Sequence, residues 1–170
     1  MRAVSDAGPL IHLSWIDQLP LLNRLFDEII VPPAVQQEVL ASPADTRGRD
    51  QIERAFVERW LRVVVPSRPI RLSRTASRAL DGGEMEAIVL AQEIGADLLI
   101  SDDLPARSEA TRRGLSVVGT VGVLVEGRNQ GLVPAAYPLI LELRSLGQWI
   151  SSELVELVRS QEVNTPRTDT

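Results

Sequence analysis

The sequence of 170 residues contains no cysteine and no lysine. Without cysteine there is no disulfide framework, no thiolate nucleophile and no zinc–thiolate site. All 18 basic residues are arginine, so no mechanism that depends on a lysine side chain is available. The single histidine, His12, also excludes a histidine-rich metal site.

Long apolar segments are missing as well. The first residues, MRAVSDAG, lack the apolar run of a signal peptide, and no stretch approaches the ~18 apolar residues that span a bilayer. We therefore expect a cytoplasmic protein with no membrane partner. With 44% hydrophobic and 24% charged residues, the chain suits one globular domain with a sizeable core.

Aromatic residues are few, at 4% of the chain. The tryptophans Trp15, Trp60 and Trp149 are too scattered along the sequence to predict a base-stacking platform. We expect each of them to pack against the core instead.

Charge is unevenly distributed. The net charge of −5 argues against generic nucleic-acid binding, but residues 47–78 hold nine arginines against three acids, a net charge of +6. Such a run is typical of a solvated helix face and loop. The alternative is an arginine-lined margin for phosphates, because the guanidinium group matches phosphate geometry.

Apolar runs alternate with amphipathic stretches along the chain. The predicted strands are RAVSD (2–6), EIIVP (28–32), LRVVVP (61–66), ADLLIS (96–101) and LSVVG (115–119). The predicted helices are one opened by Pro9, then 32–40, 50–60, 73–80, 82–95, 104–114 and two between 132 and 161. This alternation predicts an α/β fold, a three-layer α/β/α sandwich with a mostly parallel central sheet and additional C-terminal helices.

Four segments place a carboxylate at or near a strand end or a helix start. Asp6 follows the first strand, Asp102 and Asp103 follow ADLLIS, Glu38 lies in the helix after the second strand, and Glu84 opens a later helix. Ligands of open parallel sheets bind at the carboxyl ends of the strands. If these acids converge, their repulsion requires raised pKa values or a hard divalent cation, and oxygen ligands suit Mg²⁺ or Mn²⁺.

Each acid also has a purely structural interpretation. Asp6 and Asp103 precede helices that they could cap, and Asp81 with Glu84 has the spacing of a capping box. Glu38 fits an ordinary solvated charge at the edge of an amphipathic helix.

Four segments together resemble PIN-domain proteins in order and spacing: VSDAGPLIHL, IIVPPAVQQEVL, GGEMEAIVLAQEIGADLLISDDLPAR and GLSVVGTVGVLVEG. The resemblance covers residues 3–127. It implies a PIN-like nuclease domain at 1–127. The sequence pattern beyond it predicts a helical extension packed on that domain at 128–160 and a flexible polar tail at 161–170. The best-known members are VapC-type toxins, although the C-terminal helices look closer to a branch of small PIN-like proteins.

The resemblance also implies a site. Asp6, Glu38 and Asp103 match family acids, Asp102 is an accessory or substitute, and Glu84 falls where many members have aspartate. Asp6, Glu84 and Asp103, together with Asp102, would hold Mg²⁺ or Mn²⁺, and Glu38 would position an outer-shell water or the nucleophile.

The activity implied is metal-dependent hydrolysis of single-stranded RNA that leaves a 5′ phosphate. Arg47, Arg49, Arg54 and Arg107 are candidates for contacts to the RNA backbone. Gly8 departs from the family pattern, because many members have Ser or Thr there.

Two other protein classes place aspartates at strand ends but do not fit this sequence. A receiver domain and a haloacid-dehalogenase phosphatase both need a lysine that this chain lacks. A PIN-like module that binds nucleic acid or protein without cutting stays open, because Gly8 removes a hydroxyl. An antitoxin protein and a homodimer are partners that the sequence leaves undecided.

Overall fold

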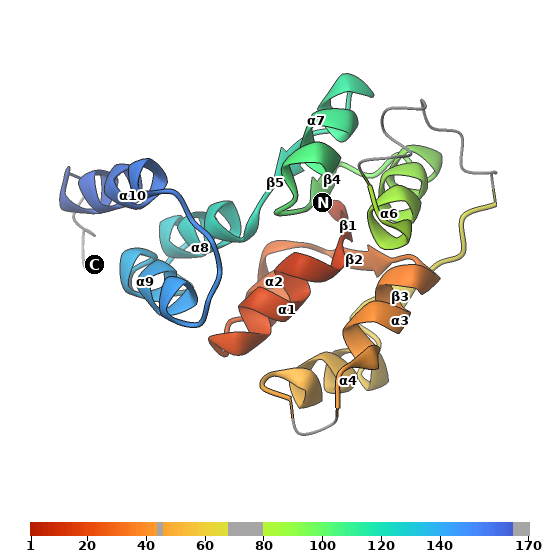
Figure 1. Ribbon diagram of the computed structural model, residues 1–170, viewed down its shortest axis with the longest axis horizontal. Helices are drawn as coiled ribbons and strands as arrows, with labels where there is room; N and C mark the ends of the chain where they lie inside the picture. The colour runs from red at the N-terminus through yellow and green to blue at the C-terminus, as the bar shows by residue number, and fades with distance from the viewer. Residues whose placement is uncertain (44–45, 68–79, 165–170) are drawn as a thin grey trace.

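The computed structural model describes residues 1–43, 46–67 and 80–164. Within them, five strands form one sheet in the order β3-β2-β1-β4-β5, and all four neighbouring pairs are parallel (Figure 1). The strands are β1 (Arg2–Ser5), β2 (Glu28–Val31), β3 (Leu61–Val63), β4 (Leu98–Ile100) and β5 (Val117–Val118). The predicted strands are thus present, and the sheet is fully parallel in the described segments.

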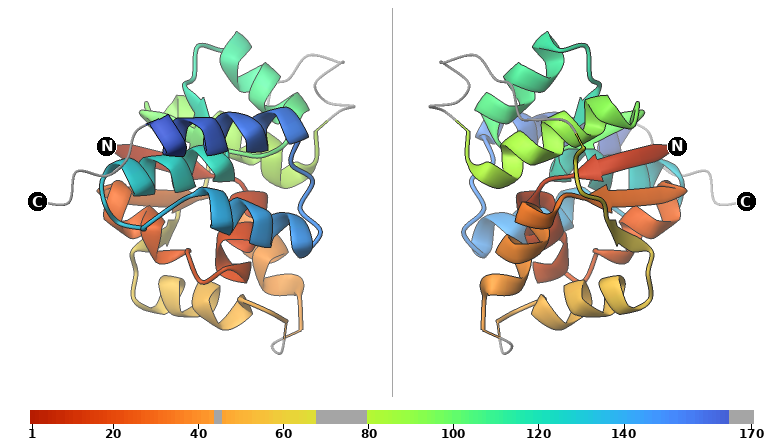
Figure 2. Two further views of the ribbon diagram at one scale, coloured as in Figure 1. Left: turned by 90° about the vertical axis from the view of Figure 1, so that its left-hand side faces the viewer. Right: turned by 90° about the vertical axis from the view of Figure 1, so that its right-hand side faces the viewer.

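Helices cover both faces of this sheet (Figure 2). They are α1 (Ala7–Trp15), α2 (Pro20–Leu25), α3 (Pro33–Ala41), α4 (Arg49–Val57), α6 (Gly82–Glu93), α7 (Leu104–Arg112), α8 (Thr120–Asn129), α9 (Tyr137–Ser145) and α10 (Ser152–Asn164). The helix predicted at 73–80 lies outside the described residues, apart from Leu80, which is not helical.

Two hydrophobic cores, one on each face of the sheet, hold the helices and the sheet together as three layers. Successive strand residues point to opposite faces, so Ala3 packs with the core beneath α1, α3 and α8, whereas Val4 packs with the core beneath α6 and α7. Leu99 and Ile100 divide in the same way between the two cores. Because the strands are buried on both faces, their sequences are continuous apolar runs. The predicted three-layer α/β/α sandwich is confirmed.

Two helices were not predicted. Helix α8, with sequence TVGVLVEGRN, is rich in valine and glycine, which disfavour an isolated helix. Tertiary packing decides its structure: a Cβ on Gly127 would lie 3.2 Å from the Leu21 side chain, so the glycine lets α8 approach the short helix α2. Pro20 at the first turn of α2 is a sequence signal for the start of a helix.

The C-terminal helices α8, α9 and α10 gather at one end of the molecule (Figure 1). Helix α9 contacts both α8 and α10, and Val155 and Val158 of α10 are buried in the core shared with α1. Helix α10 continues to Asn164, beyond the predicted start of a tail at residue 161. None of the helices in the described ranges is long and apolar enough to cross a membrane.

Candidate active site

A cleft of about 990 Å³ opens at the carboxyl edge of the sheet. The strand order changes direction at β1 and β4, and a crevice at such a switch point is the usual ligand site of an open parallel sheet. Six acids line the cleft: Asp6, Glu38, Asp81, Glu84, Asp102 and Asp103. The structure therefore brings together every acid that the sequence singled out for a site, together with Asp81, which was predicted only as a helix cap.

Asp6 is the most deeply buried of these acids, with 6% of its surface exposed. It caps α1 by accepting a hydrogen bond from the Ala7 backbone N–H at 2.7 Å, and the Ser101 hydroxyl donates to its other oxygen at 3.0 Å. Burial raises the pKa of Asp6 to about 6, although these hydrogen bonds act in the opposite direction. The negative charges of Asp81 and Glu38 raise this pKa further.

Helix α6 brings Asp81 and Glu84 to the cleft. The two residues form the predicted capping box, in which each accepts a hydrogen bond of 2.9 Å from the backbone N–H of the other. Burial, followed by the charges of Asp103, Asp81 and Asp6, raises the pKa of Glu84 to about 7 despite the hydrogen bond to its carboxylate. Glu84 can therefore cap α6 and also present a carboxylate to the cleft.

Glu38 reaches the same place from α3. A Cβ on Gly83 would lie 3.1 Å from the Glu38 carboxylate and 3.5 Å from that of Asp81, so the glycine lets α3 approach the start of α6. Partial burial and the charge of Asp81 raise the pKa of Glu38. Glu38 is therefore an exposed residue at the margin of the cleft whose carboxylate also feels the charge of Asp81.

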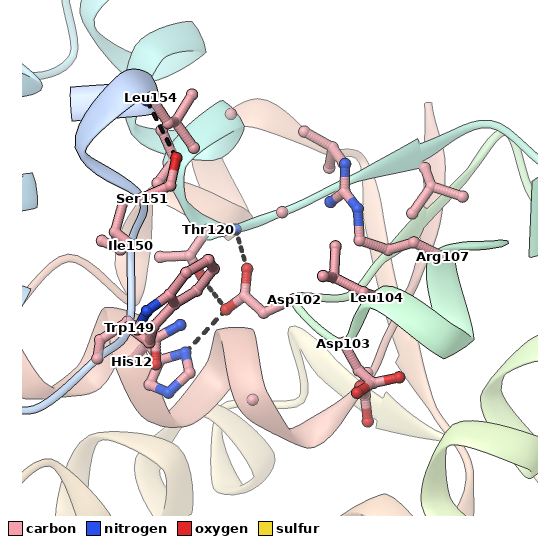
Figure 3. Close-up of a pocket in the computed structure, with 18 of the residues that line it drawn as sticks. His12, Asp102, Asp103, Leu104, Arg107, Thr120, Trp149, Ile150, Ser151 and Leu154 are labelled. Atoms are coloured by element: carbon pink, nitrogen blue, oxygen red, sulfur yellow. Dashed lines mark hydrogen bonds and ion pairs between the residues drawn. The ribbon is translucent and has the colours of Figure 1, made fainter. Parts of the chain in front are cut away.

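The neighbours Asp102 and Asp103 point in different directions (Figure 3). Asp103 caps α7, because one of its oxygens accepts a hydrogen bond from the Ala106 N–H at 2.7 Å, and its charge acts on Glu84 across the cleft.

Asp102 is instead engaged on both oxygens. One accepts from the Thr120 backbone N–H at 2.7 Å, and the other accepts from the Thr120 hydroxyl at 2.6 Å and from Nδ1 of His12 at 2.8 Å. Burial acts to raise the pKa of Asp102, but the hydrogen bonds from His12 and Thr120 outweigh it and hold this pKa below its usual value. An ionised carboxylate only accepts, so His12 carries its proton on Nδ1. Through these hydrogen bonds Asp102 joins α1 to the start of α8, and its predicted role as a metal ligand stays a prediction.

The remaining five acids, Asp6, Glu38, Asp81, Glu84 and Asp103, are called the acidic cluster below. No residue in the described segments forms an ion pair with any of them. Their oxygen donors and uncompensated charge fit a hard divalent cation. Within the same segments, no three of them lie close enough to form a complete metal site.

Of the four arginines predicted to contact RNA, Arg107 lines the cleft, where its guanidinium donates to the Ser101 carbonyl at 3.0 Å. A Cβ on Gly119 would lie 2.8 Å from this guanidinium, so the glycine makes room for it.

Arg47, Arg49 and Arg54 do not line the cleft. They pair with acids elsewhere: Arg47 with Glu142 at 3.2 Å, Arg49 with Glu53 at 2.6 Å and Arg54 with Asp50 at 3.9 Å. Arg47 and Arg54 are exposed, which favours the solvated-surface interpretation for these two. The Arg49 side chain is instead only 10% exposed, and its guanidinium donates to the Leu40 carbonyl at 3.2 Å.

The fold and the cleft define an α/β protein with an acidic crevice at the switch point of a parallel sheet. The chain belongs to the PIN-domain family, because the model of the family DUF3368, described as a PIN domain, matches residues 2–163. PIN domains have a nuclease-type fold, and the match continues through α9 and almost all of α10.

One solved structure supports the fold, and a second is similar at a lower score. A PilT N-terminus domain protein from the archaeon Sulfolobus solfataricus P2 is 21% identical, with a TM-score of 0.50, and the similarity covers 74% of this chain and 92% of that one. A domain of a functionally unknown protein from Methanocaldococcus jannaschii DSM 2661 is 24% identical, with a TM-score of 0.43, and the similarity covers 69% of this chain and 89% of that one. No curated protein matches the chain.

Proposed function

We propose that the protein is a metal-dependent ribonuclease that hydrolyses single-stranded RNA and leaves a 5′ phosphate. The observation that supports this most is the acidic cluster: five carboxylates from four parts of the chain face one cleft and have no cationic partner among the described residues. Repulsion between these carboxylates lowers the stability of the fold. A protein that keeps such a cluster is typical of one that binds a cation there.

Asp6, Glu84 and Asp103 would hold the cation, which is Mg²⁺ or Mn²⁺. When bound, the cation supplies neutralisation of phosphate charge and activation of a water molecule. The Ser101 hydroxyl fixes the orientation of Asp6, and the cap on α7 fixes that of Asp103. Because no three acids of the cluster lie close enough in the described segments, the three side chains would have to move together to hold a cation.

The protein's own residues also handle protons and charge. Because its pKa is about 7, Glu84 exchanges a proton near neutral pH, and it can give up this proton when a cation arrives. Glu38, at the edge of the cluster, would orient an attacking water. Arg107 would contact a phosphate of the bound strand, since its guanidinium lines the cleft and forms no ion pair with a described residue.

A module that binds without cutting is the second candidate. Gly8 favours it, because no hydroxyl is available where many family members have Ser or Thr, and the space beside Gly8 is bordered by the His12 ring. We also propose two protein partners, which are an antitoxin protein and a second copy of this chain in a homodimer. A small gene for a DNA-binding antitoxin directly upstream would support a role for this ribonuclease as the toxin of a toxin–antitoxin pair.

The direct test is incubation of mixed single-stranded RNA with the protein and Mn²⁺ or Mg²⁺, compared with an EDTA control. We expect cleavage with metal, none with EDTA and none with Asp6→Asn. Asp50→Asn, which changes an exposed acid outside the cleft, is the matched control and should cleave normally. RNA binding without cleavage under any metal would overturn the nuclease proposal in favour of the binding module.

A further inference from the structure

The cleft extends well beyond the acidic cluster. Its far end is apolar and is built from Val121 and Val125 of α8, Leu154 and Leu157 of α10, and Trp149 in the segment between α9 and α10. Trp149 is 77% exposed and Leu157 is 53% exposed. The prediction that Trp149 packs against the core is therefore wrong.

The other two tryptophans differ from Trp149. Trp60 packs against the main core, and Trp15 is half-buried with its ring edge to face with His12. Only Trp149 of the three lines the cleft. The exposed indole does not stand alone, because the exposed Leu154 and Leu157 line the same cleft. Adjoining exposed apolar side chains in a cleft are typical of a binding site.

The polar groups around Trp149 indicate the kind of ligand. In Figure 3, Trp149 and Arg107 lie on opposite sides of Asp102, and both line the same cleft. Arg107 offers a cation to a phosphate, and the indole offers a flat apolar face to an aromatic ring. A ligand that carries phosphate and an exposed aromatic base would satisfy both, whereas an apolar peptide would leave Arg107 and the acidic cluster without partners.

We propose that Trp149 is a stacking platform for one unpaired base of a single-stranded nucleic acid whose backbone passes Arg107. The inference rests on the proposed function and adds a base-binding subsite to it. Stacking accepts any base, because every base has an aromatic face. A duplex is excluded from this subsite, since its bases are already stacked on one another.

The test is binding of a short labelled RNA oligomer in EDTA, measured by fluorescence anisotropy on the Asp6→Asn background so that the strand is not cut. Loss of one base–aromatic stack weakens binding by about 5- to 140-fold, and we expect this loss for Trp149→Ala. Trp149→Phe should recover most of the affinity, because phenylalanine still stacks. Trp60→Phe, outside the cleft, is the control and should bind like its parent.

An abasic oligomer of the same length separates stacking from a general effect. It keeps the phosphates but has no base, so the parent and Trp149→Ala should bind it equally. Equal affinity of the parent and Trp149→Ala for the normal oligomer would overturn the stacking proposal, and so would the same loss with the abasic one. Melting temperatures of the variants verify that the fold is intact.

The two proposals fail in distinguishable ways. If the parent with Asp6 intact cleaves RNA and Trp149→Ala binds normally, the stacking site is wrong and the nuclease stands. If binding depends on Trp149 but no metal supports cleavage, the stacking site stands and the nuclease is wrong. If the protein neither binds nor cleaves single strands, both are overturned.

Discussion

Replacement of Asp6 by asparagine should stabilise the metal-free protein at pH 8. Asp6 is buried, and its pKa rises from 3.8 to about 6 on folding, chiefly because burial disfavours the charged form. An acid whose pKa is raised in the folded state lowers stability as the pH rises from its unfolded to its folded value, and the full cost applies above the latter. The difference corresponds to about 3 kcal/mol at pH 8.

Asparagine removes this cost and keeps most of the contacts. Its side-chain carbonyl can accept the Ala7 N–H and cap α1 as aspartate does. Hydrogen bonds to a neutral acceptor are weaker than those to a carboxylate, which offsets about 1 kcal/mol of the gain. We therefore expect a net increase of about 2 kcal/mol in the free energy of unfolding at pH 8.

Urea unfolding in EDTA, followed by circular dichroism at pH 8 and pH 4, measures this difference. At pH 4 the folded parent carries a protonated Asp6, so the advantage of the variant should disappear. Asp50→Asn changes an exposed pair and should shift stability by less than about 0.5 kcal/mol at either pH. An Asp6→Asn protein that is less stable than its parent at pH 8, or equally stabilised at both pH values, would refute the reasoning.

Three further substitutions separate the roles of neighbouring residues. Asp103→Asn should keep or raise the metal-free melting temperature, because asparagine also caps α7 and one repelling charge is removed. The same variant should not cleave RNA. A loss of more than about 1 kcal/mol in the free energy of unfolding would indicate that Asp103 is purely a structural cap. Asp102→Ala should cost about 1–3 kcal/mol in urea unfolding, because three hydrogen-bond donors lose their acceptor, and unchanged stability would contradict the role assigned to it. Arg107→Gln should flatten the log–log salt dependence of RNA binding by roughly 0.7, whereas Arg54→Gln should not; equal effects would place the RNA path elsewhere.

The sheet was predictable because buried parallel strands are short apolar runs, and all five appear in the sequence. Once the strands were predicted, the meeting of the acids at their ends was predictable too, because the carboxyl ends of parallel strands share one edge of the sheet. Helix α8 was not, because valine and glycine give no local helix signal and its packing against Leu21 is a tertiary contact.

Side-chain direction was the other limit. Asp102 and Asp103 are adjacent and chemically identical in the sequence, and only the position of His12 and Thr120 assigns Asp102 to a hydrogen-bond network. Trp149 gave no signal either, because exposure of a single aromatic residue depends on the path of the segment between α9 and α10. The basic run of the sequence did not show whether Arg49 and Arg54 of α4 would line the cleft, since such a run does not say which way its helix faces.

Binding of Mn²⁺ to the metal-free protein is the most direct test of the claim that the acidic cluster is a cation site. The electron paramagnetic resonance signal of free Mn²⁺ measures how much ion the protein takes up. The account predicts uptake by the parent and by Asp50→Asn, with uptake strongly weakened in Asp6→Asn. Absence of uptake by the parent at millimolar Mn²⁺, or the same uptake by Asp6→Asn as by the parent, would contradict it.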